Sequence, residues 1–86
     1  MPIVSIFFGI VIRMFYAEHG APHFHAEHQG QQGKFGFNGE MTVGNMTSRT
    51  ALRLIAEWSM LHRSELETNW ENLKAGRPIE RIPPLE

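Results

Sequence analysis

The chain has 86 residues, 42% of them apolar, which allows one domain spanning residues 1–86 with one modest core. The formal net charge is −1 with the histidines neutral, so no basic surplus is present to bind a phosphate backbone, and nucleic acid is a disfavoured partner. The absence of cysteine excludes disulfides, thiolate metal sites and cysteine nucleophiles, and agrees with a cytoplasmic location.

The N-terminal segment is apolar over residues 3–12 and is closed by Arg13. A run of about ten residues is too short to cross a bilayer, so it indicates strands and no membrane partner. Residues 3–8 predict a short first strand or an extended lead-in, with a bend or bulge at Gly9. Residues 10–16, rich in Ile, Val, Phe and Tyr, predict a central strand whose Arg13 must reach an edge or a carboxylate.

The histidine-rich segment begins after a connector over residues 17–22, where Gly20 permits a turn. From His23 the residue types alternate, so that His23, His25 and Glu27 share one face of a predicted strand. Two side chains at this spacing stand about 7 Å apart on that face. The two imidazoles can therefore converge on one metal ion or one substrate group.

The histidines allow three interpretations. In the first, they lie on a solvated sheet face or make structural hydrogen bonds. In the second, His23 and His25 bind a divalent transition metal such as zinc, with His19 or His62 as the third ligand and water in the open position. In the third, His23 and His25 form a metal-free acid–base pair, as in RNA cleavage.

The remainder of the N-terminal half predicts a hairpin. A tight turn is expected at residues 29–32, followed by a strand over residues 34–38 that presents Phe35 and Phe37 on one face. Asn38-Gly39 is a strong hairpin signal, and residues 41–44 form the return strand. We therefore predict an antiparallel meander of three to four strands in this half.

The C-terminal half has helical periodicity from Arg49 to Ala75. Thr47 or Ser48 can cap its start. We predict two helices, over residues 48–62 and 64–75, or one kinked helix as the alternative. A capping box formed by Ser64 and Glu67 favours the division into two.

The helices are expected to pack on one face of the meander, which makes the fold class α+β. Gly76 is the predicted C-cap, and Pro78 ends the helix. Residues 77–86 then form an extended, proline-containing tail that packs back onto the sheet or meets a partner.

Three features of the helical half bear on its surface. Trp58 and Trp70 are interpreted as core aromatics, with a partner-facing role as the alternative. His62 falls on the apolar stripe, which favours a buried structural group over a ligand. The basic residues alternate with glutamates, as in the predicted pair Arg53–Glu57, and so indicate a solvated helix face.

Several motifs taken together resemble a known family and cover nearly the whole chain. They are the opening Met1 to Ser5 with Gly9, Ile10 and Ile12; Glu18-His19 followed by Pro22-His23-Phe24-His25-Ala26; Glu57-Trp58, Leu61-His62-Arg63, Glu65-Leu66 and Asn69-Trp70; and the ending with Gly76, Pro78 and Ile82-Pro83-Pro84-Leu85. They resemble the small bacterial family called domain of unknown function 4160 (DUF4160). The resemblance implies a stand-alone domain often found in toxin–antitoxin or regulatory neighbourhoods, and it implies no reaction.

The function predicted first is a non-catalytic regulatory or interaction module, such as the partner or antitoxin half of a two-gene system. Its contact surface is expected on the helices, residues 48–75, or on the tail, residues 77–86. The alternative is a metal-dependent or histidine-dependent enzyme, with RNA as one possible substrate, that is built on His23, His25 and a third histidine, His19 or His62. The two hypotheses differ in whether the histidines converge around a cleft.

Overall fold

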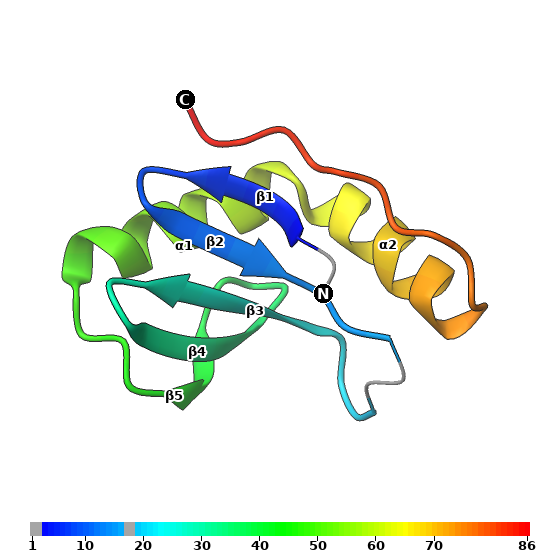
Figure 1. Cartoon of the computed structure of the whole chain (residues 1–86), viewed down its shortest axis with the longest axis horizontal. Coiled ribbons are helices and arrows are strands. Elements are labelled where there is room, and N and C mark those ends of the chain that lie inside the picture. Colours follow the sequence, from blue (N-terminus) through cyan, green and yellow to red (C-terminus); the bar gives the residue numbers. More distant parts are fainter. Residues whose placement is uncertain (1–2, 17–18) are drawn as a thin grey trace.

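The N-terminal half folds into a five-stranded antiparallel sheet, and both C-terminal helices lie on one side of it (Figure 1). The computed structural model describes residues 3–16 and 19–86. Consecutive strands are neighbours, so the sheet is a meander with β1 and β5 at its edges. The elements are β1 Ile3–Phe7, β2 Ile10–Arg13, β3 His23–His28, β4 Gln31–Gly36, β5 Met41–Gly44, α1 Arg49–Leu61 and α2 Arg63–Lys74.

This architecture confirms the predicted α+β class, and it has five strands where three or four were expected. The first apolar segment is a strand and not a lead-in, and the bulge lies between Ile3 and Ser5, before the turn at Gly9. The second strand ends at Arg13, three residues earlier than predicted. Part of the predicted connector, residues 17–18, lies outside the described residues. None of the helices in residues 3–16 and 19–86 is long and apolar enough to span a membrane.

Two of the hairpins turn through residue pairs with positive φ. These are Phe8-Gly9 at 49° and 76°, and Gln29-Gly30 at 49° and 79°. Such two-residue turns match the twist of the strands they join, which keeps β1 in register with β2 and β3 in register with β4. The hairpin predicted at Asn38-Gly39 is confirmed, but only Gly39 has positive φ, at 87°, in a longer loop.

The strands alternate between the core and solvent as the residue types predict. Along and just beyond β2, Ile10, Ile12 and Met14 are buried, whereas the side chains between them are only partly covered. The core under the helices contains fully buried aromatic and aliphatic residues from both halves of the chain, including Phe24, Phe35, Ile55, Trp58 and Leu66. Trp70 is also buried, so the core interpretation of both tryptophans is confirmed.

The helices begin at different kinds of cap. Ser48 is the N-cap of α1, as predicted, and its hydroxyl accepts a hydrogen bond from Ala51 N at 3.1 Å. The capping box predicted from Ser64 and Glu67 is wrong, because Ser64 lies inside the first turn of α2. His62 is the N-cap instead, and its non-helical backbone (φ −117°, ψ 26°) separates the two helices.

The end of α2 confirms the predicted glycine cap. Gly76 has a φ of 72°, and its N–H donates to Leu73 O at 3.2 Å while Arg77 N donates to Asn72 O at 2.8 Å. This pair of bonds is a Schellman motif, which turns the chain out of the helix. The tail that follows packs back onto the protein, since Ile82 is buried and Ile82 N donates to Val4 O of β1 at 2.9 Å.

Candidate functional site

His23 and His25 lie on β3 and are the only adjacent pair among the four predicted site histidines of the described chain. Their ring centroids are 5.2 Å apart, and the rings meet edge to face. His23 is buried against Trp70 at 5.2 Å, and its Nδ1 lies 2.8 Å from Ala21 O. His25 is half-buried, and its ring packs 4.7 Å from that of Phe15. His23 therefore belongs to the core boundary, whereas His25 reaches the surface.

His19 and His62 lie in other surroundings. His19 is exposed in the connector before β3. His62 sits at the junction of the helices, where Nδ1 donates to Glu65 Oε1 at 2.6 Å and the ring lies 5.9 Å from that of Trp58. Among the described residues, no three or more His or Glu side chains are placed to hold a metal ion. The third ligand that the zinc hypothesis requires is thus not supplied by His19 or His62.

The strand register gives His25 neighbours that are far away in sequence. Arg13 on β2 and Lys34 on β4 lie directly across from His25, one on each side. Side chains opposite each other in this way have Cβ atoms about 5 Å apart. Glu27, two residues further along β3, accepts a hydrogen bond from Arg13 Nη1 at 3.0 Å. The carboxylate that Arg13 was predicted to need is therefore Glu27.

These side chains line a hollow of about 550 Å³ on the face of the sheet that the helices leave uncovered. We call this surface the open face. The hollow is lined by Arg13, Phe15, His25, Ala26, Glu27, Gln32, Gly33, Lys34, Val43 and Gly44. Val43 is 65% exposed, and beyond the hollow Ile6, paired with Val11, is 48% exposed on the same face. Apolar side chains therefore surround the charged side chains of Arg13, Glu27 and Lys34, which we call the charged centre.

The charged centre has a cationic excess. Arg13 and Glu27 compensate each other, and within the described part of the chain Lys34 forms no ion pair. The side chains of Arg13 and Glu27 are 25% and 38% exposed, so their pair contributes little to stability, on the order of 0–1 kcal/mol. Its effect is to fix the direction of both side chains beside His25.

His25 was predicted from the sequence as a site residue, but Arg13 and Lys34 were not predicted as its neighbours. The alternation of each strand indicated which way these two side chains point. What the sequence did not provide was the register, which aligns residues 13, 25 and 34 in one row across three strands. The turn at Gln29-Gly30 was the available signal for the pairing of residues 25 and 34, because turn length sets hairpin register. The pairing of residues 13 and 25 had no such signal, because a long connector joins β2 to β3.

On the helices and the tail, where a partner contact was predicted, most of the large apolar side chains pack within the chain. Trp58 and Trp70 are buried, and the tail is docked through Ile82. The large apolar side chains that the helices leave exposed in the described structure are Met60, at 73%, and Leu61, at 68%. The helices therefore offer a small apolar surface at the end of α1.

One comparison with known proteins gives a match. The family model described as "Domain of unknown function (DUF4160)" matches residues 9–71 of the chain, from the β1–β2 turn into α2. No curated protein and no solved structure matches the chain. The matched residues include the whole row on the open face and exclude the tail.

Proposed function

We propose that this chain, which belongs to the DUF4160 family, is a cytoplasmic, non-catalytic interaction module that binds a protein partner through the open face of its sheet. The supporting observation is the composition of that face. An antiparallel sheet can expose one face to water, and such a face is then mostly polar. Here exposed aliphatic side chains lie around a hollow instead, which is typical of an interaction surface.

The charges of the open face limit the chemistry of the partner. Lys34 and the Arg13–Glu27 pair leave a cationic excess next to Phe15 and Val43. A complementary surface presents a carboxylate toward Lys34 and an apolar side chain into the hollow. We place this partner in the same two-gene system, with the chain as the regulatory or antitoxin half.

The test uses the protein encoded beside this chain in the genome. The two proteins are produced together, and their affinity is measured by calorimetry. We expect Lys34→Glu and Val43→Asp each to weaken binding by about tenfold or more, because each places a negative charge where a carboxylate or an apolar group must dock.

Matched controls come from the helical surface. Met60→Ser and Leu61→Ser change side chains that are at least as exposed as Val43 and lie outside the sheet. They should leave the affinity unchanged. Loss of binding in these two variants with retention in the sheet variants would move the interface to α1. A wild-type chain that does not bind the neighbouring product would end the proposed partnership.

A second candidate function is metal-free cleavage of RNA, which the row of Arg13, His25 and Lys34 favours. An imidazole can take up and release a proton during phosphodiester cleavage. The cations beside it would stabilise the charge that develops on the phosphate in the transition state. A metal-dependent form has less support, since the described histidines and glutamates provide no three-ligand set.

The cleavage candidate is tested with the purified chain and a fluorescent RNA in the presence of EDTA. We expect His25→Ala to reduce cleavage by about 10²-fold or more, which is the usual contribution of a general acid or base. His19→Ala is the matched control, because His19 is exposed in the connector and lines no part of the hollow. An intact RNA after incubation with the wild-type chain eliminates this candidate.

A further inference from the structure

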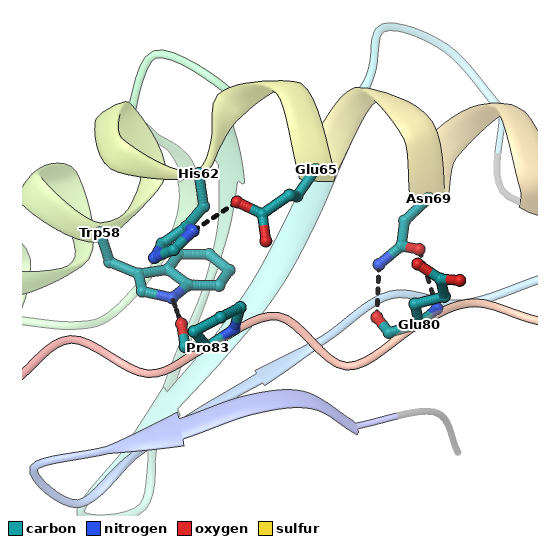
Figure 2. A network of polar contacts seen from close by, with 6 residues as sticks. All are labelled: Trp58, His62, Glu65, Asn69, Glu80 and Pro83. Carbon is teal, nitrogen blue, oxygen red and sulfur yellow. Dashed lines mark hydrogen bonds and ion pairs between the residues drawn. The ribbon is translucent and has the colours of Figure 1, made fainter.

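The C-terminal tail is held by groups that bind its backbone. Asn69 Nδ2 donates to Glu80 O at 2.8 Å, and Glu80 N donates back to Asn69 Oδ1 at 2.9 Å (Figure 2). Trp58 Nε1 donates to Pro83 O at 2.9 Å, and Val4 O of β1 accepts from the tail. We call Val4, Trp58 and Asn69 the tail site. Because these bonds go to main-chain atoms, they set few demands on the side chains of whatever segment is bound.

The tail side chains that face the protein recur at every third position. Ile82 is buried, and Ile79 and Leu85 pack against the same core, whereas Glu80, Arg81, Pro83 and Pro84 are exposed. A three-residue repeat next to prolines matches a polyproline II helix, which has three residues per turn. Aromatic surfaces with hydrogen-bond donors commonly bind proline-rich segments of this kind. Here Trp58 provides both the ring and the donor.

The junction between α2 and the tail allows the tail to dissociate from the tail site. The Schellman motif at Gly76 completes the hydrogen bonding of α2 before the tail begins. The sheet ladder and both helices therefore keep their own backbone bonds when the tail is undocked. The contacts to the tail site, the burial of Ile82 and the packing of Ile79 and Leu85 against the core are lost.

We propose that the tail site is a peptide-binding site and that the tail is a ligand bound in cis. The ligand class is an extended segment of a protein partner with aliphatic residues at three-residue intervals and a proline directly after the second of them. This surface is separate from the open face, because none of the three tail-site residues lines the hollow. The partner segment competes with the tail for Asn69 and Trp58.

The first test follows the indole N–H signal of Trp58 by NMR in the full-length chain. The chain has two tryptophans, and Trp70→Phe assigns the two signals. Ile82→Ser should release the tail and shift the Trp58 signal, and a synthetic peptide of residues 78–86 should restore it. The wild-type chain should bind this peptide at least tenfold more weakly, because its own tail competes at an effective concentration in the millimolar range. The control peptide carries Ile82→Ser and should restore nothing.

The second test keeps the tail intact, so it is valid if Ile82→Ser does not fold. Thr68 and Arg81 line one small pocket beside Asn69, and the chain has no cysteine of its own. Full-length Thr68→Cys is mixed with a peptide of residues 78–86 that carries Arg81→Cys as a mixed disulfide with 2-nitro-5-thiobenzoate. Attack of the protein thiolate on the peptide sulfur then forms the adduct and releases the nitrothiobenzoate. The disulfide adduct should form at least tenfold faster than with Thr50→Cys, an exposed control in the first turn of α1 that lines no part of this pocket.

The outcomes separate the alternatives. Restoration of the Trp58 signal together with selective trapping at Thr68→Cys supports the peptide site. Two results would overturn the peptide site and make the tail a fixed part of the fold. One is equal trapping at both cysteines. The other is a folded Ile82→Ser chain whose Trp58 signal does not change with millimolar peptide. Light scattering of the Ile82→Ser chain mixed with wild type could instead show a dimer. That result would assign the site to the tail of a second copy and would contradict a ligand from a different protein.

Discussion

Trp58→Ala is expected to lower the free energy of unfolding by about 3–5 kcal/mol. The indole is fully buried, and its ring lies 5.5 Å from Phe7 and 5.6 Å from Phe24. It also binds the tail through Pro83 O, so one substitution opens a cavity and removes a tail contact. A domain of this length has a total stability of about 4–13 kcal/mol, so the loss is a large share of it.

The measurement is urea unfolding followed by far-UV circular dichroism. Trp58→Phe is the matched control, because it retains an aromatic ring in the core but cannot donate to Pro83 O. It should cost about 1–2 kcal/mol, mostly for the lost hydrogen bond. An unfolding midpoint for Trp58→Ala equal to that of the wild type would mean that the indole is not central to the core.

Asn69→Ala is the substitution with the second-largest expected effect, about 2–3 kcal/mol of unfolding free energy. Asn69 is only 1% exposed, and both ends of its amide bond to the backbone of Glu80. Alanine removes both bonds and leaves the Glu80 N–H and C=O without these partners. Asn69→Asp should destabilise at least as much, because it replaces the donor with an oxygen and buries a charge.

Thermal and urea unfolding of these variants are compared with Thr68→Ala. Thr68 is the preceding residue of α2 and is exposed, so its substitution should stay within about 0.5 kcal/mol of the wild type. If Asn69→Ala and Thr68→Ala prove equally stable, the two amide bonds to the tail contribute nothing measurable.

The fold class could be predicted because the signals for strands, turns and helix ends each depend on only a few neighbouring residues. Period-two alternation identified the inward faces, including Phe35 and Phe37, and Ser48 and Gly76 marked the ends of the helical half. The Ser64–Glu67 motif failed for the same reason. The pattern of a capping box also fits inside a helix, and the break lies two residues earlier, at His62.

The candidate site was only partly predictable, since it combines local and distant neighbours. The i, i+2 spacing of His23 and His25 was enough to predict that they are adjacent. The difference in burial between the two histidines was not predictable in this way, because it arises from Trp70 of α2, which packs on His23. The row with Arg13 and Lys34 depends on the pairing of three strands. The spacing of residues in a single sequence does not show which strands pair or in which register.

The two edges of the sheet are protected in different ways. An uncovered strand edge can recruit a strand from another molecule and start aggregation. β5 has only four residues, which limits such recruitment, whereas β1 has five and is covered at Val4 by the docked tail. Undocking of the tail therefore lowers the resistance of the protein to self-templated assembly as well as its stability, unless an incoming segment takes the vacated position.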